Sequence, residues 1–245
     1  MDQYDEQEYL LDEQYADSSN LNARQQLHRR FTTSDENWFE WVFEQFDLPD
    51  DADVLELGCG PGDLWRENAD RIPAGWTVTL SDLSPGMVED ARENLRAVPH
   101  DLEFESFDAQ AIPYGDATFD AVVANHMLYH VPNLDATYAE IRRVLKPGGR
   151  LYAATNSEDN MQELYDFVNG FQPGGATRGA GADSFRLENG GDQLREHFES
   201  VESHTIDNGL YVTEAGPRRV RLLGAGGRRT RPGRVRGVRR APDRG

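Results

Sequence analysis

The pattern of apolar positions along the chain predicts an α/β fold. Compact apolar runs typical of buried strands occupy residues 54–57, 76–80, 102–104, 119–124 and 150–154. Helical spacing fills the intervals, over residues 64–69, from Pro85 onward and over residues 134–145. Strands that alternate with helices in this way form doubly wound, Rossmann-like sheets with helices on both faces. We therefore expect a mostly parallel sheet of this type.

Helical patterns also precede the predicted sheet. Residues 21–31 form one such pattern, and a second helix follows Ser34, the expected N-cap. In this second helix Trp38 and Trp41 recur with other apolar residues at helical spacing, which favours core packing over a ligand-binding role. We assign residues 1–46 to an N-terminal helical cap.

Beyond the fifth predicted strand the pattern is less regular. Residues 161–171 have helical spacing, and a short helix ends at Phe198. Residues 201–206 predict a sixth strand, which residues 210–213 would prolong or pair with. The main domain is therefore expected to span residues 47–214.

The charge of the chain is strongly negative and unevenly distributed. Its 245 residues include 44 acidic and 25 basic residues, a net charge of −19. Eleven of the bases and one acid lie in residues 218–244, which leaves 14 bases against 43 acids in residues 1–214. Molar salt shortens the Debye length to about 3 Å and screens the resulting repulsion. We infer a halophilic protein that does not bind nucleic acid through its body; an acidic surface kept for solubility is the alternative.

Residues 215–245 differ in composition from the rest of the chain. Arginine alternates with glycine, proline and small residues, a composition typical of disordered segments. We consider three interpretations: a reading frame shifted near Ala215, a nucleic-acid-binding arm, and an inert tail. Resequencing the gene and finding the frame intact would exclude the first.

Several simple features bear on the compartment of the protein. Cys59 is the single cysteine, so an internal disulfide is excluded. The chain has no apolar run of 18 residues, and its N-terminus lacks the charged and apolar regions of a signal peptide. We expect a cytoplasmic protein, monomeric or homodimeric, that does not enter membranes.

The first predicted strand runs into a glycine turn, with the sequence Val-Leu-Glu-Leu-Gly-Cys-Gly-Pro-Gly-Asp over residues 54–63. Glycine permits positive φ and lets a ligand approach the backbone. An unpaired Glu56 carboxylate in this apolar run would be costly, which indicates that it serves a ligand. A dinucleotide-binding turn needs its third glycine one residue later, where Asp63 would repel a diphosphate.

The pattern E-x-G-x-G-x-G resembles motif I of class I S-adenosylmethionine (SAM)-dependent methyltransferases. The resemblance implies that the turn holds the methionine end of SAM and that Glu56 helps to place its amino group. The turn residues to which this applies are Gly58, Cys59, Gly60 and Gly62.

Later segments resemble the same family in the same order. Asp82, with Leu83 beside it, ends the second strand, where a carboxylate can accept both ribose hydroxyl protons. The Asp108–Ala109 pair after the third strand resembles the segment that receives the adenine. Asn125 ends the fourth strand.

The turn at residues 147–149, Pro-Gly-Gly, looks like the family's entry into strand five, so the resemblance covers about residues 50–157. It implies that residues 158–198 form an insertion over the acceptor pocket. It also implies a further helix and a final antiparallel strand, neither of which is visible here. We expect the last strand to be missing.

His126 and His130 follow the fourth strand, near where the methyl group should point. They are candidates for a general base, which is needed only if the acceptor must lose a proton; a structural, hydrogen-bonded role is the alternative. The chain has no H-E-x-x-H motif or third ligand for these histidines, so no metal is expected.

The Asn-His-Met-Leu run at residues 125–128 resembles small-molecule methyltransferases of the broad ubiquinone/menaquinone-biosynthesis-like group. It replaces the N-P-P-Y signature that amino-methylating DNA and protein enzymes often carry. We therefore expect a methyltransferase that acts on a small molecule. The alternatives are an RNA methyltransferase that uses the basic tail and a noncatalytic SAM-binding protein.

Overall fold

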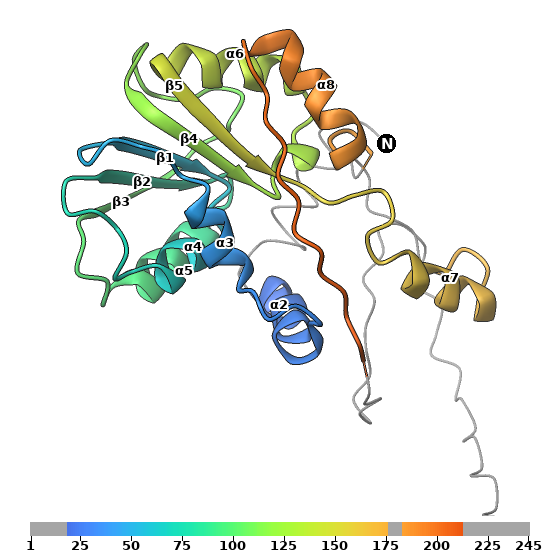
Figure 1. Ribbon diagram of the computed structural model, residues 1–245. Helices are drawn as coiled ribbons and strands as arrows, with labels where there is room; N and C mark the ends of the chain where they lie inside the picture. The colour runs from blue at the N-terminus through green and yellow to red at the C-terminus, as the bar shows by residue number, and fades with distance from the viewer. Residues whose placement is uncertain (1–18, 176–182, 213–245) are drawn as a thin grey trace, which may run out of the picture.

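The computed structural model describes residues 19–175 and 183–212, with side chains from Gln25 onward. Residues 1–18 and the basic tail at 215–245 lie outside the described residues, so the predictions made for them stay predictions. Figure 1 shows the arrangement of the helices and strands. In chain order they are α2 (Ser19–Phe31), α3 (Trp38–Glu44), β1 (Asp53–Leu57), α4 (Asp63–Glu67), β2 (Thr77–Asp82), α5 (Pro85–Leu95), β3 (Leu102–Ser106), β4 (Phe119–Asn125), η2 (Leu128–His130), α6 (Leu134–Val144), β5 (Leu145–Ala154), α7 (Gln162–Phe171) and α8 (Leu187–His197).

The five strands form one sheet in the order β3-β2-β1-β4-β5, and every neighbouring pair is parallel. This confirms the predicted doubly wound sheet. The chain starts in the middle at β1, steps outward to β3, and then returns to the other side of β1 with β4. The order therefore reverses between β1 and β4, and open α/β sheets bind ligands at the carboxyl ends of the strands beside such a reversal.

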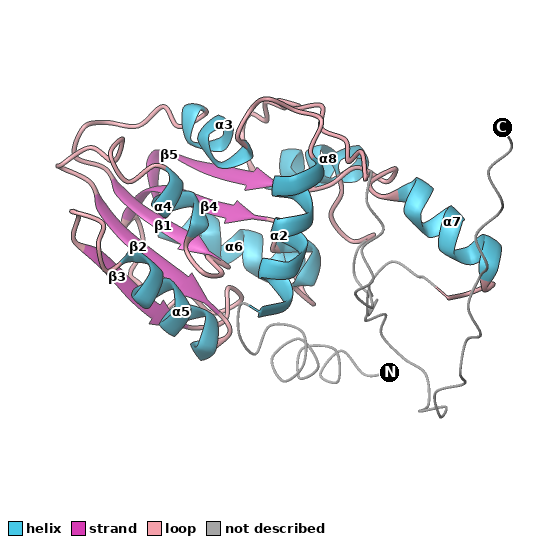
Figure 2. Ribbon diagram, turned by 90° about the horizontal axis from the view of Figure 1, so that it is seen from below, coloured by secondary structure: helices cyan, strands magenta, loops and turns pink. Residues whose placement is uncertain are grey.

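Helices cover both faces of the sheet (Figures 1 and 2). On one face, α3, α4 and α5 pack against the strands, with Phe43 and Trp65 in the core. Trp65 has no exposed surface, and its ring meets that of Phe43 edge-on. On the other face, α6 contributes Ile141 and Val144, and α8 packs beside it. The central strands are apolar on both faces because each face has its own layer of helices.

The predicted sixth strand at residues 201–206 is wrong. That segment has no strand pairing, and the chain continues in extended form until Leu210, which forms an isolated antiparallel bridge with Thr32. The Thr33 N–H donates to Gly209 O over 2.9 Å beside this bridge. A strand is stable only where a neighbour completes its ladder, and none of the described segments pairs with residues 201–206. The pattern correctly indicated extended backbone but not a place in the sheet.

The expected N-cap at Ser34 is also wrong. Asn37 caps α3, because its side-chain oxygen accepts the Phe39 N–H over 2.9 Å. Ser34 instead accepts the Glu36 N–H over 3.1 Å and so stabilises the turn that precedes the helix. Both residue types can cap a helix, and the one adjacent to the first helical turn does so. The expected packing of Trp38 against the core is confirmed.

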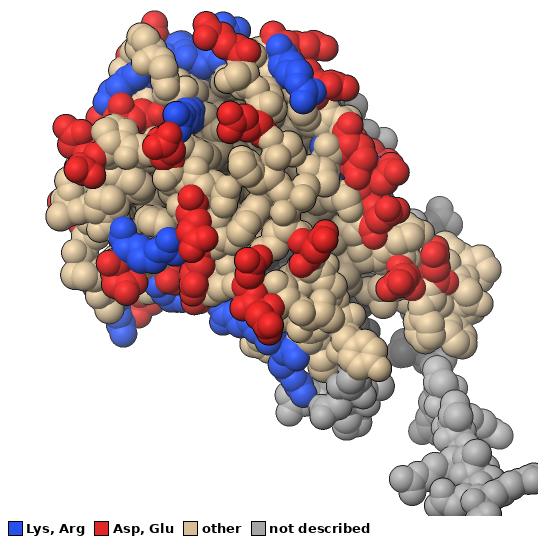
Figure 3. All heavy atoms as spheres, viewed as in Figure 1, with Lys and Arg blue, Asp and Glu red and all other residues tan. Residues whose placement is uncertain are grey.

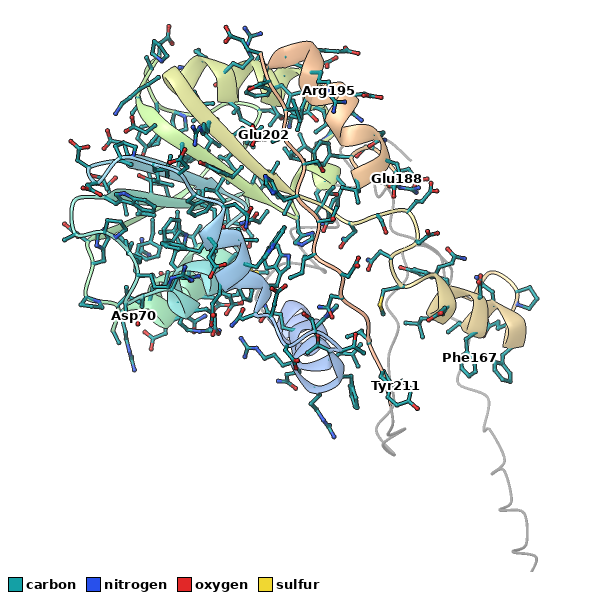
Figure 4. The ribbon with its side chains drawn as sticks, viewed as in Figure 1. Asp70, Phe167, Glu188, Arg195, Glu202 and Tyr211 are labelled. Carbon is teal, nitrogen blue, oxygen red and sulfur yellow. The ribbon has the colours of Figure 1, made fainter. Side chains whose placement is uncertain are left out.

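Acidic side chains are spread over the surface, with arginines between them (Figure 3). Helix α7 carries two large exposed apolar side chains, Phe167 at 64% and Phe171 at 79% exposed. Figure 4 shows Phe167 pointing away from the sheet. In the part of the chain that the structure describes, no helix has the length and apolar character needed to cross a bilayer.

Candidate cofactor and acceptor site

The glycine turn follows β1 at the carboxyl edge of the sheet. Gly58, Gly60 and Gly62 have φ values of 66°, 53° and 79°, a region that other residues rarely adopt. A side chain at Gly58 would also place its Cβ 2.6 Å from the Cβ of Met127. Cys59 sits between them, and its N–H donates to Ser81 O over 2.9 Å. The glycines are therefore required by the backbone path of the turn and by its neighbours.

Asp82, the last residue of β2, ties this turn to the next strand. One carboxylate oxygen accepts the Gly60 N–H over 3.0 Å, and the other accepts the Ser84 N–H over 2.9 Å. Burial raises the pKa of Asp82, while the backbone donors oppose that shift. Leu83 follows directly, and its carbonyl accepts from the Ser106 hydroxyl over 3.3 Å. Each carboxylate oxygen has a second lone pair, so Asp82 can still accept ligand hydroxyls.

Glu56 is buried beneath the turn and is only 2% exposed. The Trp65 indole N–H donates to its carboxylate over 2.7 Å, so Glu56 has one hydrogen-bond partner within the protein. Burial, reinforced by the charges of Asp82 and Asp63, nevertheless raises the pKa of Glu56 to about 7. The hydrogen bond from Trp65 and the nearby amide of Asn125 oppose this shift only in part. A cationic ligand at this position would favour the ionised carboxylate.

Asn125 lies beside Glu56 at the end of β4. Its side-chain nitrogen is buried and lacks good hydrogen-bond geometry to any described residue, although it is near enough to lower the pKa of Glu56. A buried donor without a partner costs about 1–3 kcal/mol. A carboxylate that attracts a cation and an amide that lacks an acceptor fit the ammonium and carboxylate groups of an amino acid. The described residues thus fit the amino-acid end of SAM.

The Asp108–Ala109 pair occupies the loop after β3. The Asp108 carboxylate accepts the Gln110 N–H over 2.9 Å, and Ala109 is 7% exposed. The Phe107 N–H donates to Asp82 O over 3.3 Å, which joins this loop to the end of β2. The structure therefore brings the loop to the same edge as the glycine turn.

His126 and His130 follow β4 at the same edge. His126 has a positive φ of 54°, and its N–H donates to Ala154 O over 2.9 Å. Its ring lies against Trp38 with centroids 4.9 Å apart. Burial, with a smaller contribution from the charge of His28, lowers the pKa of His126 to about 4. His126 is therefore neutral at pH 7. The ring of His130 packs against that of Tyr129, with centroids 4.5 Å apart.

Trp38 is a residue at this site that the sequence reasoning missed. Helical spacing identified it as a core residue, and it does pack against the core. Its contact with His126 depends on how α3 crosses the end of β4, which no local pattern reveals.

The N-terminal helix α2 docks beside the glycine turn. The Gln25 side-chain amide donates to the Asp63 carboxylate over 2.5 Å, and Arg29 pairs with Glu67 over 3.3 Å. His28 of the same helix is close enough to shift the pKa of His126. The described part of the expected N-terminal cap therefore adjoins the candidate site. No group of three metal-binding side chains occurs within residues 19–175 and 183–212.

Comparisons with known proteins agree with this architecture. Residues 55–153 match the family model described as a methyltransferase domain. The chain is 31% identical over 182 residues to the ubiquinone/menaquinone biosynthesis C-methyltransferase UbiE of Haemophilus ducreyi, covering 66% of this chain and 70% of that protein. It is 37% identical over 114 residues to the malonyl-[acyl-carrier protein] O-methyltransferase of Erwinia pyrifoliae, covering 45% of this chain and 40% of that protein.

The coverage of further relatives and solved structures varies. The chain spans about half, 53%, of the UbiE protein of Desulfotalea psychrophila, to which it is 31% identical over 55% of its own length. Among solved structures, it is similar in fold to the putative methyltransferase crystallised with the Haloferax volcanii Trm112 activator. That match has a TM-score of 0.51 and 24% identity, and it covers 73% of this chain and 71% of the other.

The glycine turn, the acid at the end of β2 and the order of the parallel sheet agree with the sequence matches. This chain belongs to the class I SAM-dependent methyltransferases, whose cofactor is S-adenosylmethionine.

Proposed function

We propose that the protein transfers the methyl group of SAM to a small-molecule acceptor. The observation that carries the proposal is the buried carboxylate of Glu56 beside the unsatisfied amide of Asn125, beneath the glycine turn. These two groups are costly in the protein alone and match the charged end of SAM. The similarity to a relative named as a ubiquinone/menaquinone biosynthesis C-methyltransferase supports a small-molecule acceptor, and the similarity to a malonyl-[acyl-carrier protein] O-methyltransferase supports methyl transfer.

In this proposal each part of SAM has its own contacts. Glu56 and Asn125 hold the amino-acid end, and the turn formed by Gly58, Cys59, Gly60 and Gly62 gives it close access to the backbone. Asp82 and Leu83 hold the ribose, and Asp108 and Ala109 hold the adenine. Because the turn and Asp82 are already hydrogen-bonded to each other, the binding edge is largely pre-formed.

When bound, SAM supplies a methyl group on an activated sulfonium, which passes to the acceptor nucleophile and leaves S-adenosylhomocysteine. The contribution of the protein is alignment and the exclusion of water. His126 is neutral at physiological pH and can accept the proton that the acceptor loses as its nucleophilic atom gains the methyl group. Its low pKa makes it a weak base, which suits a proton released late, after the methylated atom has become acidic. His130 is the second candidate for this role.

We further propose that the acidic body is an adaptation to high salt. Residues 1–214 carry 29 more acids than bases, and acids are spread over the surface in Figure 3. Such a surface disfavours phosphate backbones, which supports a small molecule rather than a nucleic acid as the acceptor.

Calorimetric titration with SAM and with NADH in molar KCl tests the proposed cofactor. We expect binding of SAM and none of NADH; the reverse result would overturn the proposal. Incubation with methyl-labelled SAM and metabolite extracts or RNA then tests the acceptor class. Label in RNA that is lost on removing residues 215–245 would establish the RNA alternative, and binding without any methyl transfer would favour a noncatalytic protein.

A further inference from the structure

Arg143, on the face of α6 that meets the loop after β3, makes an unusual number of contacts for a half-exposed residue. Its guanidinium donates to Ile112 O over 2.9 Å and to Tyr114 O over 2.7 Å. It also forms a two-pronged ion pair with Glu140, with both distances 2.7 Å. A planar guanidinium can satisfy several fixed acceptors at once, whereas a lysine cannot.

Glu140, also on α6, contacts the same loop through its carboxylate. Its carboxylate accepts the Ile112 N–H over 2.9 Å while it holds Arg143. The backbone of Ile112 is therefore held at both its N–H and its carbonyl by one ion pair. The Ile112 side chain is 3% exposed and packs in the core beneath the loop. These contacts fix the far end of the loop to α6.

The near end of the same loop is fixed to the sheet, because the Phe107 N–H donates to Asp82 O. Asp108 and Ala109 lie between these two anchors. The Asp108 carboxylate accepts the Gln110 N–H, its carbonyl accepts the Ala111 N–H over 2.9 Å, and Ala109 packs in the same buried cluster as Ile112. The anchors at Phe107 and Ile112 thus both contribute to the position of the Asp108–Ala109 pair.

We propose that Arg143 and Glu140 are positioning residues that set the affinity for the purine nucleoside end of the cofactor. They do so by holding the loop of residues 107–114, and they leave the amino-acid end unaffected. The inference rests on the proposed function, because it takes Asp108 and Ala109 as the adenine-binding pair. Glu56 and Asn125 are on β1 and β4 and share no hydrogen bond with Arg143 or Glu140 among the described residues.

Two ligands separate the two ends of the cofactor. S-adenosylhomocysteine has both ends, and 5′-methylthioadenosine has the nucleoside without the amino-acid end. We expect Arg143→Ala to weaken both by the same factor, about ten- to hundredfold, since several hydrogen bonds to charged groups are lost. Glu56→Gln should weaken S-adenosylhomocysteine alone. Arg142→Ala is the matched control, because Arg142 is the exposed neighbour on α6 with the same charge.

If Arg143→Ala does not fold, the variants Arg143→Lys and Glu140→Gln take its place in the same binding measurements. Lysine retains the charge but cannot reach both carbonyls and Glu140 together, so it should still weaken both ligands. Amide hydrogen exchange provides a direct readout: we expect faster exchange confined to the loop, with Ile112 most affected. Unchanged affinity for both ligands in a folded Arg143 variant, or exchange that rises uniformly over the protein, would overturn the inference. Failure of the wild type to bind S-adenosylhomocysteine would instead count against the proposed function.

Discussion

Replacing Glu56 by glutamine should stabilise the protein at neutral and alkaline pH. Burial raises the pKa of Glu56 from 4.5 to about 7, so the folded protein binds a proton that the unfolded chain has already released between these values. The free energy of unfolding therefore falls as the pH rises from about 4.5 to about 7, and this loss is complete above pH 7. At about 1.4 kcal/mol for each pH unit, ionised Glu56 opposes folding by about 3 kcal/mol.

Glutamine has nearly the same shape and keeps an oxygen that can accept the Trp65 N–H. It does not ionise, so the difference in unfolding free energy between the variant and the wild type should increase from pH 5 to pH 8, by up to about 3 kcal/mol. Asp82, whose pKa is also raised by burial, is present in both proteins and largely cancels. The exposed Glu199→Gln controls for the change in net charge.

Urea unfolding in molar KCl at several pH values measures this difference. A variant that is less stable than the wild type at pH 8, or a difference that does not change with pH, would refute the reasoning. In either case Glu56 would have its ordinary pKa in the folded protein, and its burial would be compensated by Trp65 alone.

Four further predictions follow from the same geometry. Asp82→Ala should raise the dissociation constant for SAM about ten- to hundredfold by calorimetry, and unchanged affinity would remove Asp82 from the site. SAM affinity should fall by up to about tenfold for each pH unit below 7, because binding the cation must release the proton of Glu56; equal affinity at pH 6 and pH 8 would contradict this. Trp38→Leu should expose His126 to water and raise its NMR titration midpoint from about 4 toward 6.5, with Trp41→Leu as the control; an unmoved midpoint would exclude shielding by Trp38. The melting temperature should rise by several degrees between low and molar KCl; an unchanged melting temperature would reject salt adaptation.

The sequence predicts the sheet and its carboxyl edge well because both depend on local patterns. The central strands β1 and β4 are short and largely apolar, and Asp82 and Asn125 end their strands, so parallel pairing brings them to one edge. The pairing of Glu56 with Trp65 is not predictable in this way. It depends on how α4 folds back beneath the glycine turn, nine residues along the chain.

The two incorrect predictions, the N-cap at Ser34 and the strand at residues 201–206, have a common cause. Ser34 and Asn37 are equally good caps in composition, and only the position at which α3 meets the core selects Asn37. Residues 201–206 have the composition of a strand, but a strand also needs a partner. Leu210 finds its partner at Thr32, far away in the sequence. Both outcomes depend on tertiary contacts, which the local sequence preferences do not encode.

The two edges of the sheet differ in a way that supports the proposed site at the carboxyl edge. The opposite edge has a cavity of about 460 Å³ near Asp120 and Pro147, and it also carries several charges. There Lys146 lies between Asp53 and Asp120 at 2.8 and 2.7 Å, so each of these charged groups has a partner of opposite sign within the protein.

The carboxyl edge is different because it holds buried groups that are costly in the protein alone. Glu56 has a raised pKa despite its hydrogen bond, Asn125 has a buried donor without a good acceptor, and His126 adopts a positive φ. Each of these costs folding free energy, and all three lie at the ends of the neighbouring strands β1 and β4. Such costs are expected at a binding site, because a bound ligand supplies the missing charge and hydrogen bonds. The opposite edge of the sheet, where the charged groups pair with one another, does not show them. The position of the unsatisfied groups therefore identifies the site better than the volume of the cavity.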